Sequence, residues 1–250
     1  AHEIGALDAR GRSEVMLRPP YESFPGASDG LSNDDFLSAA SSDQPLLRRR
    51  PDGALVPYAD APRGWNELVV DGRGNAYVNG PGFDPRSGEP FAPGIVALVT
   101  PDGKVREVAD GIAFPNGMAV TPDNRTLIVA DSYGKQLTGF DIAPDGSLAN
   151  RRAWAELGDG VPDGICLDAD GCVWYADVPN KRCVRVREGG EVLQTVDVDR
   201  GCFACMLGGD DGRTLFIVAA QWKGMQGMSP GTRTGQILQT PAPAPHAGRP

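Results

Sequence analysis

Three segments of the sequence repeat one pattern: residues 65–71 (WNELVVD), 115–121 (PNGMAVT) and 162–168 (PDGICLD). Each has Asn or Asp at its second position, continues as an apolar run, and is followed by a polar turn and a second apolar run. The segments begin 50 and 47 residues apart. Periods of about 40–50 residues, with four strands in each unit, are typical of the blades of a β-propeller.

Two weaker units and a leading fragment extend this repeat. The units start near residues 26–30 (GASDG) and 203–209 (FACMLGG), and the fragment from Glu3 to Val15 has the pattern of the outer half of a blade. The sequence lacks the eight helical segments that a TIM barrel requires. We therefore expect an all-β fold, a single β-propeller domain over residues 1–250 from which the inner strands of the first blade are missing.

Short runs rich in β-branched and aromatic residues lie between frequent Gly and Pro residues. The clearest runs cover residues 67–70, 76–78, 127–130, 172–176 and 215–219, and their composition predicts strands. The turns between the runs repeat Asp-Gly, a pair that supplies the positive φ angles of tight hairpins. These pairs begin at Asp52, Asp71, Asp102, Asp145, Asp170 and Asp211. The pattern predicts antiparallel hairpins.

Charge and hydropathy limit the partners. The formal net charge is −9, so we expect no nucleic-acid partner, because a phosphate backbone repels an acidic surface. No apolar run approaches the roughly 20 residues that span a bilayer, so we expect no membrane association. The first residues show no apolar signal-peptide region. We expect a cytoplasmic protein that is a monomer or a weak homodimer.

The five cysteines are Cys166, Cys172, Cys183, Cys202 and Cys205. An odd number in a chain of this size is not typical of a secreted disulfide framework. Cys202 and Cys205 have the CxxC spacing of redox and zinc sites, but no second CxxC pair and no neighbouring histidine accompany them. We therefore predict buried, reduced thiols.

Histidine is almost absent: His2 and His246 are the two in the sequence, and both lie in terminal segments. This excludes a Ser-His-Asp triad, a histidine general base in the core and a histidine-ligated zinc ion. Chemistry in the core must use carboxylates, amides, cysteines or a metal held by oxygen. Oxygen ligands suit hard cations such as Ca²⁺, Mg²⁺ and Mn²⁺.

Asn66, Asn116 and Asp163 occupy equivalent positions in the three strong units. Because the inner strands of a propeller line its central channel, equivalent side chains from successive blades converge at one mouth of that channel. Two amide oxygens and one carboxylate would suit a hard cation. Alternatively, these residues form Asx turns that open each strand, which is what Asn and Asp do most often. The repeat leaves both interpretations open.

The same segments resemble a known family. Residues 115–118 (PNGM) and 162–168 (PDGICLD) are similar to the two most diagnostic motifs of the senescence-marker/gluconolactonase (regucalcin-like) family, and residues 65–67 (WNE) resemble a third. The resemblance covers nearly the whole chain, strongly from Gly64 to Ala220 and weakly before Ala61. The resemblance implies a six-bladed β-propeller with a divalent cation in its channel, and lactone hydrolysis as its activity. We expect Ca²⁺ as the cation, with Mg²⁺, Mn²⁺ and Zn²⁺ as alternatives.

The resemblance also implies the ligands. Asn116 and Asp163 would bind the cation directly, and Asn66 would bind it or contact it through water and substrate. The family supplies a glutamate from a Glu-x-Pro motif on the first inner strand, and this sequence has no such motif. Neither Glu3 nor Glu22 has the context to replace it. We expect the motif in a segment that precedes residue 1, and we assign no substitute.

Further residues are candidates for contact with the substrate: Asn66, Asn79, Tyr133 and Arg63. Family members with an arginine near this position place it two residues before the asparagine, whereas Gly64 stands there in this chain. Asn79 and Tyr133 lie at strand ends that would reach the channel mouth.

Asp163 is the candidate catalytic residue, because it is the acid among the three converging positions and can take the proton of the attacking water. The expected substrate is a small-molecule sugar lactone. Two other functions stay open. One is a metal-dependent organophosphate or aryl-ester hydrolase on the same propeller, and the other is a non-catalytic binding scaffold.

Overall fold

The computed structural model describes residues 3–8, 10–18, 25–31, 35–40, 45–60, 65–84, 87–224 and 233–248. These residues form strands and turns, and among them no helix is long and apolar enough to cross a membrane. The prediction that Arg63 contacts the substrate concerns a residue outside this part of the chain.

Four sheets consist of four antiparallel strands that follow one another in chain order. Their strands are β3 (Pro25–Gly30), β4 (Phe36–Ala40), β5 (Leu46–Arg49) and β6 (Leu55–Ala59); β7 (Glu67–Val70), β8 (Ala76–Gly80), β9 (Gly94–Val99) and β10 (Val105–Ile112); β11 (Pro115–Val120), β12 (Thr126–Asp131), β13 (Gln136–Ile142) and β14 (Leu148–Glu156); and β15 (Pro162–Leu167), β16 (Val173–Asp177), β17 (Arg182–Val186) and β18 (Val192–Asp197). A fifth sheet has three strands, β19 (Gly201–Gly208), β20 (Thr214–Ala220) and β21 (Gln236–Pro241).

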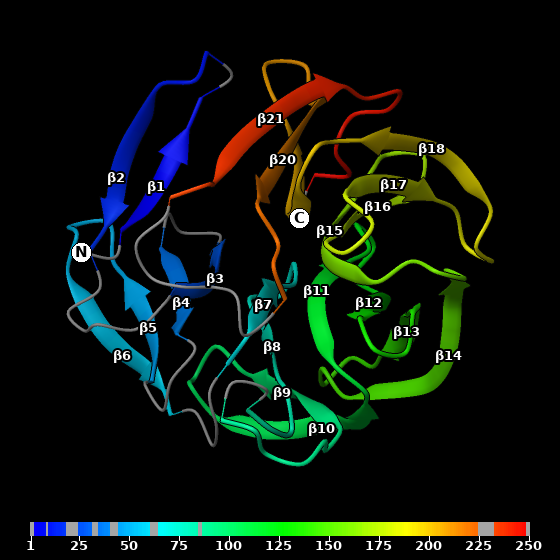
Figure 1. The fold of residues 1–250 in the computed structure, drawn as a ribbon. Coiled ribbons are helices and arrows are strands. Elements are labelled where there is room, and N and C mark those ends of the chain that lie inside the picture. The colour runs from blue at the N-terminus through cyan, green and yellow to red at the C-terminus, as the bar shows by residue number, and fades with distance from the viewer. Residues whose placement is uncertain are drawn as a thin grey trace.

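The five sheets are arranged around a common centre, as Figure 1 shows. Each sheet begins with its innermost strand, and the inner strands of successive sheets contact one another: β3 with β7, β7 with β11, β11 with β15, and β15 with β19. The meander within each sheet follows from the short turns, which join neighbouring strands into hairpins. The prediction of an all-β propeller is therefore confirmed.

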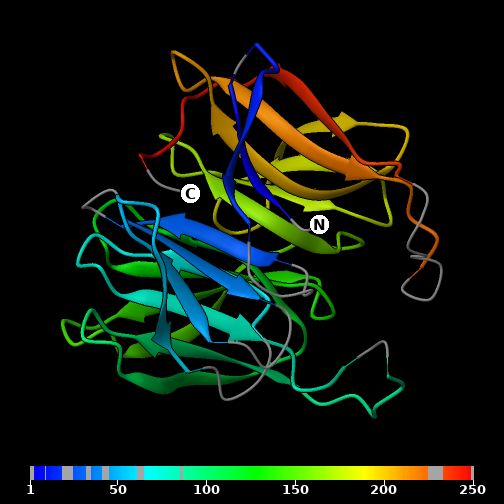
Figure 2. The same cartoon turned by 90° about the vertical axis from the view of Figure 1, so that its left-hand side faces the viewer.

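The prediction of six blades is wrong for the described residues, which form five. The leading fragment forms a separate two-stranded sheet of β1 (Ile4–Leu7) and β2 (Ser13–Leu17). Figures 1 and 2 place this hairpin between β21 and the sheet β3–β6. The fragment from Glu3 to Val15 is long enough for two outer strands only. It therefore contributes no inner strand to the channel.

The turn chemistry follows the sequence closely. All five of the clearest predicted strands are present, as β7, β8, β12, β16 and β20. At five of the six Asp-Gly pairs the glycine has a positive φ angle, as Gly103 does at 79°. At the sixth pair the positive φ lies on Gly74 instead, and the backbone N–H of Gly72 donates a hydrogen bond to the side chain of Asn124 in the next blade.

The hydrophobic core is divided into clusters that lie between neighbouring blades. One cluster joins the blade β3–β6 to β7–β10 around Trp65 and Leu68, and others join each later pair of blades. All five cysteines are buried and free, as predicted. Because the blades pack through these clusters, the inner strands hold fixed positions around the channel.

Candidate functional site

The inner strands begin at one mouth of the channel. Pro115 and Pro162 are the first residues of β11 and β15. Asn116 and Asp163 are therefore the second residues of the inner strands of two neighbouring blades. Both strands have an irregularity here: the pairing shifts between Pro115 and Met118, and again between Pro162 and Ile165. Bulges of this kind redirect side chains and occur often beside active sites.

Side-chain amides connect the blade β7–β10 to the start of β11. The Nδ2 group of Asn66 donates a hydrogen bond to the backbone carbonyl of Pro115 at 3.2 Å. Asn79, at the end of β8, donates from Nδ2 to the backbone carbonyl of Asn116 at 2.6 Å. The structure therefore brings Asn66 and Asn79 to the backbone that carries Asn116.

A second set of contacts connects β11 to β15. Asn116 Nδ2 lies 3.4 Å from Ser132 Oγ, and the Ser132 hydroxyl donates to the carbonyl of Pro162 at 2.6 Å. The Asn116 side chain also lies close enough to the Asp163 carboxylate to lower its pKa. Asn116 and Asp163 are thus direct neighbours, and Asn66 and Asn79 lie in the adjoining blade.

The glycines that follow these two residues have a steric cause. A Cβ atom on Gly117 would lie 2.5 Å from the backbone nitrogen of Ile165 and 2.6 Å from the backbone oxygen of Asp163. A Cβ atom on Gly164 would lie 2.8 Å from the Cα of Ala204 on β19. Because adjacent inner strands touch through their backbones, no side chain fits at either position. The Asn-Gly and Asp-Gly pairs therefore set the spacing of the mouth.

A second carboxylate faces Asp163. Burial, and then the charges of Asp163 and Asp29, raise the pKa of Glu67 to about 8. Burial raises the pKa of Asp163 to about 7, although hydrogen bonds from the Asn116 side chain and the Gly164 backbone lower it. By exposed surface area, the side chains of Glu67 and Asp163 are only half-buried. The protein atoms around the two carboxylates nevertheless exclude most bulk water, so their charged forms are poorly solvated.

The sequence alone predicted no role for Glu67, although this residue lies in the third motif. In the repeat Glu67 aligns with Gly117 and Gly164, so its unit has an acid where the other two units have a glycine. Its strand pairs in regular register, Glu67 opposite Asn79, without the irregularity found in β11 and β15. An acid at a position that is glycine in the sister units is the signal that points to it.

Asn79 and Tyr133 differ in their environments. The Asn79 side chain is fully buried, and its Oδ1 atom has no hydrogen-bond partner among the described residues. An acceptor left in this state costs about 1–3 kcal/mol. Tyr133 is 50% exposed and stacks on Phe114, so its ring lies at the surface beside the mouth.

The metal-ligand prediction depends on which types of side chain meet at the mouth. Within the described ranges no group of three or more His, Cys, Asp or Glu side chains is arranged to hold a metal ion. A cation at this mouth would depend on amide oxygens as well as on the carboxylates of Glu67 and Asp163.

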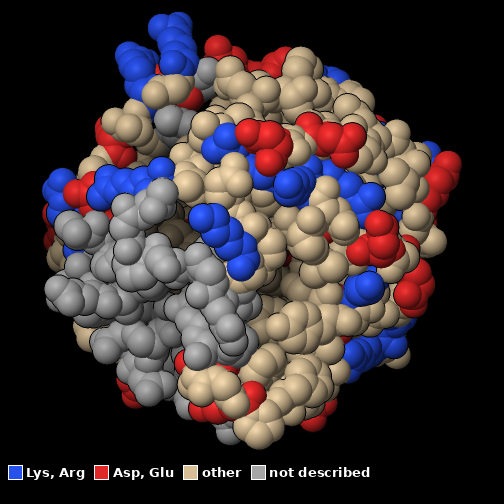
Figure 3. Space-filling model, viewed as in Figure 1, with Lys and Arg blue, Asp and Glu red and all other residues tan. Residues whose placement is uncertain are grey.

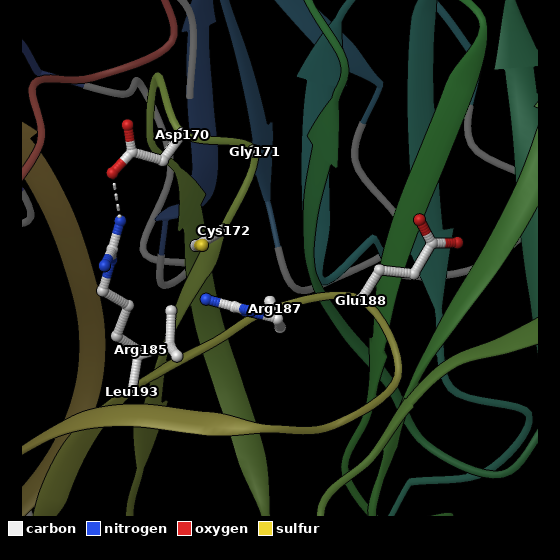
Figure 4. Close-up of a pocket in the computed structure, with 7 residues that line it drawn as sticks. All are labelled: Asp170, Gly171, Cys172, Arg185, Arg187, Glu188 and Leu193. Atoms are coloured by element: carbon white, nitrogen blue, oxygen red, sulfur yellow. Dashed lines mark hydrogen bonds and ion pairs between the residues drawn. The ribbon is translucent and has the colours of Figure 1, made fainter.

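A cavity of about 420 Å³ lies at the opposite end of β15 and β16, and Figure 4 shows the residues that line it. Its charged groups are already paired: Arg185 binds Asp168 at 2.7 Å and Asp170 at 2.8 Å, and Arg187 binds Glu191 at 3.2 Å. Ion pairs of this kind stabilise the turn that starts at Asp168. Cys172 also lines this cavity, but it is buried and its thiol pKa is raised by burial, which disfavours the nucleophilic thiolate. The channel mouth is therefore the stronger candidate.

The two raised pKa values predict how stability depends on pH in the metal-free protein. The ordinary values are 4.5 for Glu67 and 3.8 for Asp163, so between about pH 4 and pH 8 the folded chain binds more protons than the unfolded chain. The free energy of unfolding should therefore fall as the pH rises through this window. Thermal unfolding in a chelator between pH 5 and pH 9 measures the effect. Glu67→Gln should flatten the profile, and an unchanged slope in this variant would contradict the assignment.

Comparison with known proteins agrees with this architecture. The family model described as the SMP-30/Gluconolactonase/LRE-like region matches residues 2–221. Regucalcin of Xenopus laevis is 31% identical over 169 residues, which are 62% of this chain and 56% of regucalcin. The 6-deoxy-6-sulfogluconolactonase of Pseudomonas putida is 28% identical over 132 residues, 51% of this chain and 45% of that enzyme. The chain thus spans about half the length of the curated relatives it matches.

Solved structures share the fold. The calcium-binding protein regucalcin from Agrobacterium tumefaciens superposes with a TM-score of 0.78 at 21% identity, covering 99% of this chain and 84% of that one. A gluconolactonase from Xanthomonas campestris gives a TM-score of 0.72 at 24% identity, covering 87% and 76%. Together with the family match over residues 2–221, these findings show that the chain belongs to the SMP-30/gluconolactonase/LRE-like family.

Proposed function

We propose that the protein is a hydrolase that opens a lactone ring with the help of one divalent cation at the channel mouth. One observation carries the proposal: the backbones of β11 and β15 touch at Gly117 and Asp163, which brings Asn116 and Asp163 of neighbouring blades together at the mouth. Glu67 lies near enough for the charge of Asp163 to raise its pKa. The family membership and the sulfogluconolactonase relative support a lactone as the substrate.

The donor set fits a hard cation. The side chains of Asn66, Asn116, Asp163 and Glu67 offer amide and carboxylate oxygens, which Ca²⁺, Mg²⁺ and Mn²⁺ prefer. Burial raises the pKa of both carboxylates, and the charge of Asp163 raises that of Glu67 further, so the two negative charges repel each other. A divalent cation would relieve that repulsion in place of protons. We assign Asn116 and Asp163 as its ligands and Asn66 as a ligand or substrate contact.

When bound, the cation would polarise the lactone carbonyl and lower the pKa of a water molecule beside it. We propose that Asp163 takes the proton from the attacking water. The same proton can then pass from Asp163 to the ring oxygen that leaves, so the carboxylate is ionised again at the end of the reaction.

Asn79 and Tyr133 have different parts in this scheme. Asn79 holds the backbone of Asn116 through its hydrogen bond and is too buried to meet the substrate directly. It therefore acts as a positioning residue. Tyr133 is exposed at the rim, where a substrate substituent can reach its ring.

A metal-dependence assay tests the proposal. The purified protein is stripped with a chelator and supplied with δ-gluconolactone, and ring opening is followed with a pH indicator. We expect activity to require added Ca²⁺, Mg²⁺, Mn²⁺ or Zn²⁺ and to exceed the turnover of a phosphotriester or a simple aryl ester. Preference for the phosphotriester would favour the organophosphatase alternative. Absence of hydrolysis with every cation would favour the non-catalytic scaffold.

A further inference from the structure

Four aromatic side chains gather beside the channel mouth: Phe83, Phe91, Phe114 and Tyr133, called here the aromatic cluster. The rings of Phe114 and Tyr133 are stacked, with centroids 4.7 Å apart. Phe83 lies edge-on to Phe91 at 5.5 Å and to Phe114 at 6.0 Å. Ring centroids 4.5–7 Å apart attract one another in these arrangements, so the four rings form one surface.

The aromatic cluster adjoins the proposed site through the chain itself. Phe114 precedes Asn116 by two residues, and Tyr133 follows Ser132, the hydroxyl that contacts Asn116. The other two rings belong to the connection 81–93, which begins directly after β8, where Asn79 ends its strand. Figure 2 shows this connection projecting beyond the sheets at the lower right. A substituent on a substrate bound at the mouth would therefore meet these rings.

Asp131 fixes the stacked pair of rings. Its buried carboxylate accepts hydrogen bonds from the backbone N–H groups of Ala113 at 3.1 Å, Phe114 at 3.0 Å and Gly134 at 3.0 Å. One side chain thus holds the backbone on both sides of the stack between Phe114 and Tyr133. The two rings are ordered before any ligand arrives, which lowers the entropy cost of binding.

The connection 81–93 is also held closed at its base. A Cβ atom on Gly82 would lie 2.1 Å from the backbone oxygen of Pro93, so the two ends of the connection touch through their backbones. Farther along the connection, the backbone carbonyl of Asp84 accepts a hydrogen bond from the Ser87 hydroxyl at 3.0 Å. The backbone N–H of Asp84 donates to the Glu89 carboxylate at 2.9 Å. These contacts fix where Phe83 and Phe91 are presented.

The rings remain open to solvent. Phe91 is 57% exposed and Tyr133 is 50% exposed. Adjacent exposed aromatic rings on a soluble protein mark a binding surface more often than isolated ones do. The connection carries two exposed acids, Asp84 and Glu89, and one base, Arg86, so its charge does not select an ionic ligand. In Figure 3 an uncharged area lies below and to the right of the centre, between acidic groups at the lower edge and mixed charges at the right edge, and this area suits a neutral apolar group.

We propose that the aromatic cluster is a substrate subsite, and that the preferred substrate is a lactone that carries an aromatic substituent. The carbonyl group of this substrate lies between Asn116 and Asp163, and its aryl ring lies against Phe91 and Tyr133. The inference rests on the proposed lactone hydrolysis and adds the substrate class. A bare sugar lactone would leave these rings unused.

The test compares two lactones that share the six-membered ring and differ in the substituent on the carbon that bears the ring oxygen, 5-phenyl-δ-valerolactone and 5-methyl-δ-valerolactone. The wild-type protein should show a kcat/KM at least about tenfold higher for the phenyl compound, mainly through a lower KM, as apolar pockets give about 10–200-fold discrimination. Phe91→Ala and Tyr133→Ala should each lower this preference by about fivefold. Val192→Ala, a control on β18 with the same 57% exposure as Phe91, should leave the preference within about twofold.

The outcomes separate this inference from the proposed function. Equal turnover of both lactones, unchanged in Phe91→Ala, overturns the subsite and leaves lactone hydrolysis standing. If neither lactone is hydrolysed, binding of the non-hydrolysable 6-phenylpiperidin-2-one is measured by calorimetry. Binding that is at least about fivefold weaker in Phe91→Ala than in wild type then supports the subsite without the reaction. Equal binding, or no binding by the wild type, overturns the subsite as well.

Discussion

Asp163→Asn should lower kcat/KM for lactone hydrolysis by about 10³-fold or more, within the range that loss of a general acid–base group produces. The change removes the charge that we assign to cation binding and the carboxylate that accepts the proton of water. It keeps the shape of the side chain, so the packing of β15 should survive. The melting temperature should therefore stay within a few degrees of wild type.

Asp197→Asn is the matched control for this experiment. Asp197 is an exposed acid at the end of β18 in the same blade, far along the sheet from the inner strand. This variant carries the same change in charge and should keep wild-type activity. Near-wild-type turnover of Asp163→Asn at saturating cation would remove Asp163 from the mechanism.

Gly117→Ala should destabilise the fold by about 3 kcal/mol, the upper part of the usual range for overpacking. Its new Cβ atom would lie 2.5 Å from the Ile165 nitrogen, so β11 and β15 must move apart. For a chain of this size the melting temperature should drop by about 5–10 °C. Because the same movement separates Asn116 from Asp163, activity measured well below the melting temperature should fall more than the folded fraction does.

Gly30→Ala is the control for Gly117→Ala. Gly30 is likewise in an inner strand, as the last residue of β3, but a Cβ atom there would meet nothing within 4 Å. This variant should change the melting temperature by less than about 2 °C, since surface substitutions usually cost under 0.5 kcal/mol. Equal stability of both alanine variants would show that the backbone contact at Gly117 does not set the spacing of the mouth.

Much of the architecture was predictable because local chemistry decides it. The Asp-Gly pairs dictate hairpins, and the apolar runs between them dictate strands, so β7, β8, β12, β16 and β20 follow from sequence alone. The repeat of Asn or Asp before each inner strand also predicted that Asn116 and Asp163 lie at one mouth. Their roles as ligands remain predictions.

Other features depend on contacts between blades, which a single sequence does not display. The number of blades was predicted from the family resemblance, whereas the described chain forms five and a two-stranded hairpin. Burial raises the pKa of Glu67, and the charge of Asp163, which is 96 residues away in the chain, raises it further. The aromatic cluster combines three separate connections, and no periodicity in the sequence links Phe83 to Tyr133.

The central claim is that Asn116 and Asp163 together bind a divalent cation. The most direct measurement is a crystal structure of the protein grown with Ca²⁺, with the ion identified by its anomalous scattering. The account predicts a single strong peak about 2.3–2.6 Å from an Asn116 side-chain oxygen and an Asp163 carboxylate oxygen, the usual range for calcium ligands. A cation bound elsewhere, with water alone between Asn116 and Asp163 at saturating Ca²⁺, would contradict it.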